Sequence, residues 1–166
     1  MPTTGVVLLT LKRGVDNAIK DYTTAIELKP DDPYAYSGRG KAYRKKREFD
    51  NAMKDYTTAI KLKPDHFYAY GGQGRVYTTK GKFDNAIRDY NIAIQLRPDY
   101  AKSYYNRGET WLHLQEWQEA KSDLTIAEDK GVDITAEFHN EYVSVEDFER
   151  KTGIQLPPDI AEMLTQ

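Results

Sequence analysis

The sequence has no cysteine among its 166 residues. This absence excludes disulfide bonds, cysteine nucleophiles and cysteine metal sites, and it favours a reducing compartment. Charge of one sign is not in excess either, because the formal net charge is only −2. A charge so close to zero gives no indication of binding to nucleic acid or to an acidic membrane. We therefore expect a cytoplasmic protein whose partners are neither nucleic acids nor membranes.

Long apolar runs are also lacking. One apolar run, at residues 6–11, is far shorter than the ~20 residues that a helix needs to span a bilayer. It has no basic residues before it and no small-residue cleavage site, so it does not indicate a secretory signal. We interpret the run as part of a buried helix.

The residue patterns of common enzyme sites are missing as well. The histidines His66, His113 and His139 do not have the spacing of a metal-binding pair on a helix. The glycine-rich segment 71–74 lies in a helical pattern and follows no predicted strand, so packing explains it better than a phosphate-binding loop does. We predict a protein that is not an enzyme and has no catalytic residues, cofactor or metal site.

The sequence does contain a block that returns at a constant interval along the chain. Residues 16–22 read Asp-Asn-Ala-Ile-Lys-Asp-Tyr, closely similar residues follow at 50–56 and 84–90, and a weaker copy lies at 118–124. A fixed period of about 34 residues is typical of stacked helical repeats, in which each unit buries its apolar face against its neighbours. Such a fold predicts a binding surface rather than an active site.

Each unit is predicted to form two helices. In the unit 33–66, Asp32 can accept hydrogen bonds at the N-terminus of a first helix, and Pro33 suits the first helical position. A second helix begins near Phe49 and ends before Pro64, because the residue preceding a proline is disfavoured in helical geometry. Small residues recur in both helices and predict that the helices pack closely: Gly40, Gly74 and Gly108 in the first, and Ala18, Ala52, Ala86 and Ala120 in the second.

With this pattern the chain resembles the tetratricopeptide repeat (TPR) family. The family's succession of aromatic, glycine, aromatic, alanine, aromatic, alanine and proline is matched in the unit 33–66 by Tyr36, Gly40, Tyr43, Ala52, Tyr56, Ala59 and Pro64. The match extends over residues 14–131. The resemblance implies an all-α fold, a right-handed superhelical solenoid of TPR helix-turn-helix units, and the residues after the repeats add a C-terminal helical cap.

The predicted division of the chain follows from the repeat. It consists of an incomplete N-terminal TPR unit at 1–32, TPR units at 33–66, 67–100 and 101–131, and a C-terminal helical capping segment at 132–166.

Within the capping segment, Asp133 and Ser144 are predicted to cap helices and Gly153 to end one. Whether 132–166 is only a cap, or a docking segment that fills the chain's own groove or engages a partner, stays open.

The N-terminal unit departs from the family pattern. Val6 stands where the family has glycine, and Leu9 stands where it has an aromatic residue. We expect residues 5–13 to form a worn or truncated first helix that covers the second helix, 15–29, imperfectly. The apolar surface left at this edge would be a site of self-association.

A second departure concerns charge. Arg39, Gln73 and Arg107 occupy a position where the family usually has an apolar residue. A packed charge is costly unless it is paired. Aspartates recur at one position of the second helices, as Asp21, Asp55, Asp89 and Asp123. We predict that Arg39 and Arg107 each pair with one of these aspartates; the alternative is a packed arginine stem with its head in solvent.

The TPR resemblance also implies a concave groove lined by the first helices. The candidate peptide-binding residues are Tyr34, Ser37, Lys41, Arg44, Lys45, Tyr68, Arg75, Thr78, Lys102, Tyr105, Glu109 and His113. Only Glu109 is acidic, whereas lysine and arginine recur, which favours an acidic ligand. The alternative is an ordinary solvated helix face. The clamp with which some TPR proteins hold acidic chaperone tails is matched poorly, because only Lys102 falls at a clamp position, and Ser37 and Gly72 stand where lysine and asparagine are required.

These observations predict a protein–protein interaction scaffold or adaptor that binds a peptide or helix, with acidic character, in its groove. Two alternatives stay open: a self-associating structural module that uses the N-terminal edge, and a regulatory subunit of an enzyme. Lys41→Glu with Arg75→Glu should abolish partner capture and leave the oligomeric state unchanged, whereas Leu9→Asp should do the reverse.

Overall fold

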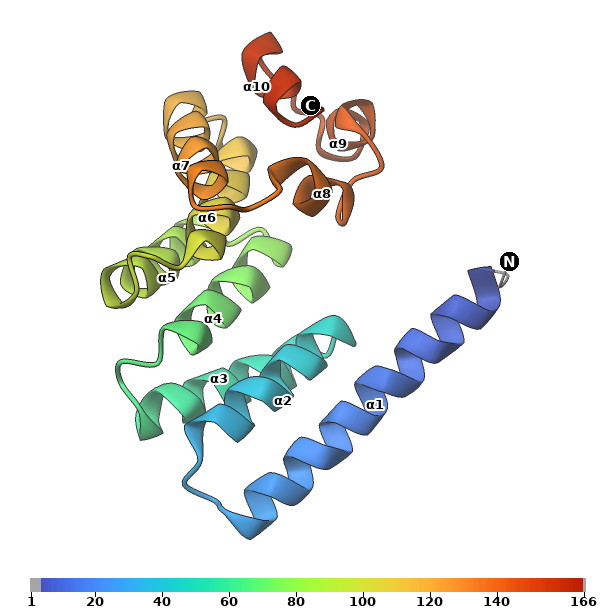
Figure 1. Ribbon diagram of the computed structural model, residues 1–166, viewed down its shortest axis with the longest axis vertical. Helices are drawn as coiled ribbons and strands as arrows, with labels where there is room; N and C mark the ends of the chain where they lie inside the picture. The colour runs from blue at the N-terminus through green and yellow to red at the C-terminus, as the bar shows by residue number, and fades with distance from the viewer. Residues whose placement is uncertain (1–3, 166) are drawn as a thin grey trace. The chain divides into compact units, whose positions relative to one another are not determined.

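The computed structural model describes residues 4–165, and of residues 4–13 it describes the backbone alone. All regular secondary structure in residues 4–165 is α-helical, so the prediction of an all-α fold is confirmed (Figure 1). The helices are α1 (Thr4–Leu28), α2 (Pro33–Lys45), α3 (Phe49–Leu62), α4 (Phe67–Thr79), α5 (Phe83–Leu96), α6 (Ala101–Leu114), α7 (Trp117–Asp129), α8 (Ile134–His139), α9 (Val145–Thr152) and α10 (Pro158–Met163).

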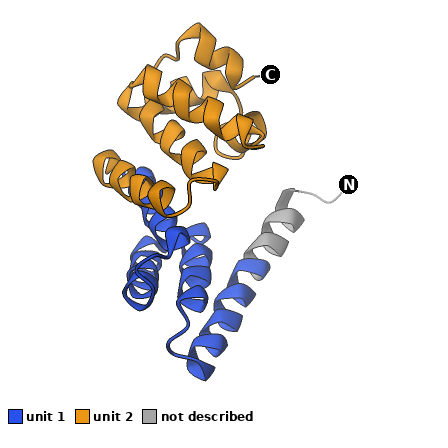
Figure 2. Cartoon of the chain, turned by 60° about the vertical axis from the view of Figure 1, so that its left-hand side comes forward, with its two compact units in different colours: residues 1–80 blue, residues 81–166 orange. Residues whose placement is uncertain are grey.

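The chain forms two compact units, Met1–Lys80 with α1 to α4 and Gly81–Gln166 with α5 to α10 (Figure 2). In the first unit α2 packs against both α1 and α3, and α4 packs against α2 and α3. In the second unit α6 packs against α5 and α7, and α7 contacts α8. None of the helices in the described part of the chain combines the length and the apolar character that crossing a membrane would require.

The helix ends follow the predicted capping residues. Asp32 accepts a hydrogen bond from the backbone N–H of Tyr34 at 2.9 Å, with Pro33 as the first residue of α2. Asp133 caps α8 by accepting from the N–H of Ala136 at 2.8 Å. The predicted start and end of α9 are also confirmed. Ser144 accepts a hydrogen bond from the N–H of Asp147 at 3.3 Å, and Gly153 ends the helix with a φ of 74°.

The turns after α2, α4 and α6 share a backbone feature that the sequence did not reveal. Arg47, Gly81 and Gln115 occupy the same position in successive repeats, and their φ angles are 65°, 68° and 59°. A residue in this left-handed region reverses the chain tightly at a helix end. Only one of the three is glycine, so the repeat encodes this turn by position rather than by residue type.

The structure corrects the prediction for the N-terminal segment. Residues 5–13 do not form a helix separate from 15–29, because α1 runs without a break from Thr4 to Leu28. Arg13, which precedes Arg47 by one repeat, lies inside this helix. A helix that continues satisfies its own backbone hydrogen bonds, and Val6 and Leu9 do not supply the small and aromatic residues that a folded-back first helix would use. Residues 5–13 therefore do not fold back over 15–28, and their side chains, including Leu9, lie outside the described residues.

The small residues allow close contact between paired helices, as predicted. A Cβ atom added at Gly40 would lie 3.0 Å from Cε1 of Tyr56 and 3.3 Å from the backbone oxygen of Ala52. A Cβ atom at Gly108 would lie 3.1 Å from Cγ of Leu124. These distances are shorter than ordinary van der Waals contact, so a Cβ atom at either position would require the neighbouring atoms to move by a few tenths of an ångström.

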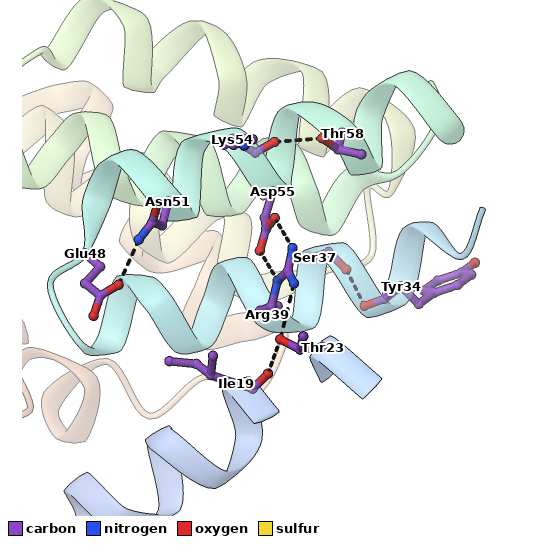
Figure 3. Close-up of polar contacts among 10 residues, drawn as sticks. All are labelled: Ile19, Thr23, Tyr34, Ser37, Arg39, Glu48, Asn51, Lys54, Asp55 and Thr58. Atoms are coloured by element: carbon purple, nitrogen blue, oxygen red, sulfur yellow. Dashed lines mark hydrogen bonds and ion pairs between the residues drawn. The ribbon is translucent and has the colours of Figure 1, made fainter. Parts of the chain in front are cut away.

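The predicted pairing of arginine with aspartate is confirmed in both units. Nε of Arg39 on α2 donates to Oδ2 of Asp55 on α3 at 2.7 Å, and Nη2 donates to Oδ1 at 2.9 Å (Figure 3). Arg107 makes the same two contacts with Asp123, both at 2.7 Å. The Asp55 side chain is only 5% exposed, and its hydrogen bond raises the pKa of Arg39 above its ordinary value. The guanidinium groups of Arg39 and Arg107 are therefore paired with aspartates, and the alternative of an arginine head in solvent is wrong.

The same arginines also contact the helix that precedes them. Nη1 of Arg39 donates to the hydroxyl of Thr23 on α1 at 3.2 Å, and Nη1 of Arg107 donates to Oδ1 of Asn91 on α5 at 2.6 Å (Figure 3). Gln73 makes the corresponding contact from α4 to Thr57 on α3, at 2.9 Å. In each case the partner lies 16 residues earlier. A polar residue at this position thus links one helix pair to the preceding one.

Candidate functional site

The first helices of the unit Met1–Lys80 carry most of the predicted binding residues. We call this set the basic face: Tyr34, Ser37, Lys41, Arg44 and Lys45 on α2, and Tyr68, Arg75 and Thr78 on α4. Spacings of three, four and seven residues place the members of each helix on one side of it. Because α2 and α4 pack against each other, the two sets lie on neighbouring helices.

The charges of these two helices are of one sign. Neither α2 nor α4 contains aspartate or glutamate, although the whole chain is slightly acidic. Lys41 and Lys45 are exposed, and Arg44 is half-buried. Tyr34 and Tyr68, at the N-terminal ends of the helices, are 61% and 48% exposed. The basic face therefore offers positive charge beside flat aromatic surface, which is suited to an acidic segment of extended or helical chain.

Two hydroxyl groups of the basic face are engaged within the protein. Ser37 donates to the backbone oxygen of Tyr34 at 3.1 Å, and Thr78 donates to that of Gly74 at 3.1 Å. Nε2 of the buried His66 lies within hydrogen-bond distance of the Ser37 oxygen, at 2.9 Å. Burial, followed by the charge of Lys63, lowers the pKa of His66. His66 is thus a neutral structural residue.

The aromatic side chain that connects the two helices of the basic face comes from α3. The ring of Tyr56 lies across two glycines: an added Cβ would be 3.0 Å from the ring at Gly40 on α2 and 2.3 Å from it at Gly72 on α4. Burial raises the pKa of the Tyr56 phenol, and the positive charges of Arg44 and Arg75 oppose this effect in part. The ring of Tyr56 thus packs against both helices that carry these arginines.

The position of Tyr56 at this face was not predicted from the sequence, although a signal was present. Gly72 follows Tyr56 at the same spacing at which Gly38 follows Tyr22, one repeat earlier. The ring of Tyr22 indeed occupies the space of the absent Cβ at Gly38, at 2.4 Å. A tyrosine followed by glycine at this fixed spacing is therefore a packing pattern of this chain.

The predicted residues of α6, in the unit Gly81–Gln166, have a different environment. Tyr105 is 1% exposed and Glu109 is 5% exposed. Nζ of Lys102 pairs with Oε1 of Glu137 on α8 at 2.7 Å. A ligand would therefore meet Lys102 already paired, and it would reach Tyr105 only if the covering residues moved.

His113, the last residue predicted on α6, is enclosed by aromatic side chains. Its ring stacks on Phe83 at 5.1 Å and lies 5.6 Å from the ring of Phe148 on α9. The hydroxyl group of Tyr142 lies 3.2 Å from Nε2 of His113. Burial lowers the pKa of this histidine, so it is neutral near pH 7.

The C-terminal segment packs on the repeat helices as a cap requires. One buried cluster joins Tyr105 and Leu112 of α6 with residues of α7, α8, α9 and α10, among them Phe138, Phe148 and Ile160. Lys121 on α7 also pairs with Asp159 on α10 at 2.5 Å. The segment thus covers α6 and α7, and its Glu137 forms the ion pair with Lys102, a predicted groove residue.

The three histidines lie in separate environments within residues 4–165. His66 and His113 occupy different packed sites, as described above, and His139 is exposed. Among the described residues no group of three or more histidine, aspartate or glutamate side chains is arranged to hold a metal ion.

Two family models match the sequence. A model described as TPR repeat matches residues 15–46 and 74–113, and one described as tetratricopeptide repeat matches residues 33–66. No curated protein matches the sequence of the chain.

Several solved structures are similar to the chain. A crystal structure of MamA has a TM-score of 0.62 and 25% sequence identity, over 77% of this chain and 72% of that one. The first TPR of Spaghetti (RPAP3), bound to the HSP90 peptide SRMEEVD, has a TM-score of 0.59 and 26% identity, over 65% of this chain and 88% of that one. The second of these structures is named for the same repeat that the family models describe, in agreement with the helix pairs reported above.

Proposed function

Because the chain belongs to the tetratricopeptide repeat family, we propose that it is a non-enzymatic protein-interaction module that binds an acidic peptide segment on the basic face. The observation that carries this proposal is the charge of α2 and α4. These helices present Lys41, Arg44, Lys45 and Arg75 and contain no acidic residue. The absence of cysteine supports a cytoplasmic location as part of the same proposal.

A similar structure supports the acidic character of the ligand. The first TPR of Spaghetti (RPAP3) is bound to the peptide SRMEEVD, which carries acidic residues near its C-terminal end. The residues that would hold such a ligand here differ from the family's clamp, because Ser37 and Gly72 occupy two clamp positions and Lys102 already pairs with Glu137. We therefore assign the main electrostatic contacts to Lys41, Arg44 and Lys45.

A charge-reversal experiment tests this function. The variant Lys41→Glu/Lys45→Glu should lose binding to short peptides rich in aspartate and glutamate, measured by fluorescence anisotropy at low salt. The matched control is Lys54→Glu/Lys61→Glu, which makes the same change in net charge with two exposed lysines of α3. The control should bind as the unaltered protein does. Equal loss in both variants, or no binding of acidic peptides by the unaltered protein, would contradict the proposal.

Peptide binding and light scattering together distinguish a peptide-binding scaffold from a self-associating module. If the N-terminal edge joins copies of the chain, Leu9→Asp should lower the molar mass measured by light scattering and leave peptide binding unchanged. The Lys41→Glu/Lys45→Glu variant should lose peptide binding and keep the molar mass of the unaltered protein. A monomeric unaltered protein at high micromolar concentration would exclude self-association.

A further inference from the structure

The helix α1 leaves open a face that the later second helices of the repeat bury. In α3, α5 and α7 three recurring residues are at most 2% exposed: Ala52, Tyr56 and Ala59; Ala86, Tyr90 and Ala93; Ala120, Leu124 and Ala127. The same positions of α1 hold Ala18 and Ala25, which are half-buried, and Tyr22, which is 37% exposed. The residues that stand one repeat before α2 belong to α1 itself, so they do not cover this face.

The open face continues along α1 as a line of apolar positions. Going back from Ala18 by steps of three and four residues leads to Val15, Leu11 and Leu8. Because the backbone of α1 is helical from Thr4 onward, these positions follow one side of the helix. We call the six residues of this line the α1 seam: Leu8, Leu11, Val15, Ala18, Tyr22 and Ala25. Apolar residues at such steps over three heptads are typical of a helix that pairs with another helix.

The contact with α2 uses a different side of α1. The hydroxyl of Thr23 accepts a hydrogen bond from Nη1 of Arg39 at 3.2 Å (Figure 3), and Asp16 pairs with Nζ of Lys46 at 3.0 Å. Thr23 and Asp16 each follow a seam residue by one position, which is about 100° around the helix. The seam therefore lies beside the surface that α2 covers, and a further helix has to come from elsewhere.

The charges of α1 indicate which helix would fit. Residues 4–13 include Lys12 and Arg13 and no acidic residue, whereas residues 21–28 include the exposed Asp21 and Glu27 and no basic residue. Two antiparallel copies of α1 place the basic half of each helix beside the acidic half of the other. Parallel copies would bring like charges together. Charge complementarity thus favours a second copy of α1 in the antiparallel orientation.

The sizes of the seam residues favour the same arrangement. If two antiparallel seams are centred between Val15 and Ala18, these two residues oppose each other, and Leu8 of one copy opposes Ala25 of the other. A large residue then meets a small one in both pairs, which keeps the distance between the helices even along the seam. In a parallel pair, leucines would meet at one end and alanines at the other.

We propose that α1 is a dimerisation helix whose seam is covered by the α1 seam of a second copy in antiparallel orientation. Both copies then use the same surface, as a two-fold interface requires. Leu9 stands one residue off the seam, so this dimer differs from an edge contact that depends on Leu9. The dimer does not use the basic face, and the inference therefore does not depend on peptide binding.

One pair of substitutions tests the dimer in the described part of α1. At high micromolar concentration the unaltered protein should have twice the molar mass of one chain in light scattering. Ala18→Glu should have the mass of a monomer, because it places a charge in the seam. Asn17→Glu makes the same change in charge at the exposed neighbouring residue and should stay dimeric. A monomeric unaltered protein, or equal masses of the two variants, would overturn the proposal; circular dichroism checks that both variants are folded.

Two adjacent leucines give a second matched pair. Leu8→Asp changes a seam residue and should yield a monomer, whereas Leu9→Asp makes the identical change off the seam and should leave the dimer intact. Loss of the dimer in Leu9→Asp alone would show that another surface of the N-terminal edge joins the copies, and the seam would be wrong.

Cross-linking determines the orientation, because the chain has no cysteine of its own. In a mixture of Leu8→Cys and Ala25→Cys chains, a short bis-maleimide should join one variant to the other. Ala25→Cys alone should not cross-link, since antiparallel helices hold the two copies of this residue about 25 Å apart. Cross-linking of Ala25→Cys alone would overturn the antiparallel arrangement, and no cross-link in either sample would overturn the seam as the interface.

Discussion

Arg39 stabilises the fold through its partners rather than through its own burial. Its guanidinium group binds Asp55 with two hydrogen bonds and Thr23 with a third, and it lies 5.7 Å from the ring centre of Tyr36. An aspartate as enclosed as Asp55 would be left as an uncompensated charge if the arginine were removed. Pairing with Asp55 thus explains why the repeat tolerates a charged residue, Arg39, at a packed position.

We expect Arg39→Met to lower the free energy of unfolding by about 3 kcal/mol, because it leaves Asp55 buried without its cation. The double variant Arg39→Met/Asp55→Leu should recover most of this loss, since both charges are then gone. Urea denaturation measures both values. The exposed neighbour Lys41 provides the control, and Lys41→Met should change stability by less than about 0.5 kcal/mol. A double variant as unstable as the single one would contradict this account.

Asp89 stands at the same repeat position as Asp55 and Asp123 but has a different environment. Its Oδ2 atom is buried and has no hydrogen-bond partner among the described residues. The first helices of the repeat units 33–66 and 101–131 carry Arg39 and Arg107, whereas the repeat unit 67–100 carries Gln73 at the same position. Burial raises the pKa of Asp89 to about 6, and the charge of Arg88, 3.6 Å from Oδ1, offsets this only in part.

The raised pKa predicts how stability depends on pH. In the unfolded chain Asp89 ionises near its ordinary value of about 4, whereas in the folded protein it keeps its proton up to about 6. Its favourable contribution is therefore complete below about pH 4 and is lost as the pH rises through about 6. Asp89→Asn should raise the free energy of unfolding by roughly 2 kcal/mol at about pH 7.5 and change it little at about pH 4.

Urea denaturation at the two pH values tests this expectation for Asp89. The exposed Asp129 at the end of α7 is the control, and Asp129→Asn should have the same small effect at both pH values. An increase for Asp89→Asn that is equal at both pH values would show that ionisation of the carboxyl group is not its cause.

At the scale of the helix, α1 differs from the other second helices of the repeat. It continues without a break through Gly14. At the equivalent point of the later repeats the chain turns, next to Arg47, Gly81 or Gln115, each of which has a positive φ. Gly14 lies in exposed, regular helix, and a Cβ atom added there meets nothing within 4 Å. The conformation, rather than the available space, therefore decides the effect of a substitution at this position.

We expect Gly14→Ala to raise the free energy of unfolding by up to about 1 kcal/mol, because alanine is favoured over glycine inside a helix. Gly81→Ala is the matched control: its Cβ also meets nothing within 4 Å, but the φ of 68° is unfavourable for alanine. Gly81→Ala should lower stability by about 1 kcal/mol. Thermal unfolding followed by circular dichroism gives both values, and a loss at Gly14 like that at Gly81 would show that α1 is interrupted there.

The helix pairs could be placed from the sequence, whereas α1 could not. Asp32, Pro33 and Pro64 are local signals, and they predicted where α2 begins and α3 ends. The turn after α2 has no such signal, since Arg47 is not a residue that favours a left-handed conformation. Its counterpart Arg13 is the same residue type and remains helical, so residue type at this position does not determine whether the chain turns.

At the scale of the whole molecule, the two compact units leave different surfaces on their first helices. In the unit Met1–Lys80, Lys41, Lys45 and Tyr34 stay exposed. In the unit Gly81–Gln166, the C-terminal helices share a core with α6 and pair Glu137 with Lys102. Lys41 is therefore open to a ligand, whereas Glu109, which occupies the equivalent position two repeats later, is buried.

The sequence by itself determined the family, the helical class, the pairing of Arg39 and Arg107 with aspartates, and the caps of α2, α8 and α9. All of these depend on residue type and on a constant repeat spacing, which the chain displays directly. Only the tertiary structure decided that α1 is continuous, that the ring of Tyr56 packs against two glycines, Gly40 and Gly72, and that Tyr105 and Glu109 are buried. These features depend on which surfaces meet, and contacts between residues far apart in sequence are not fixed by a local pattern.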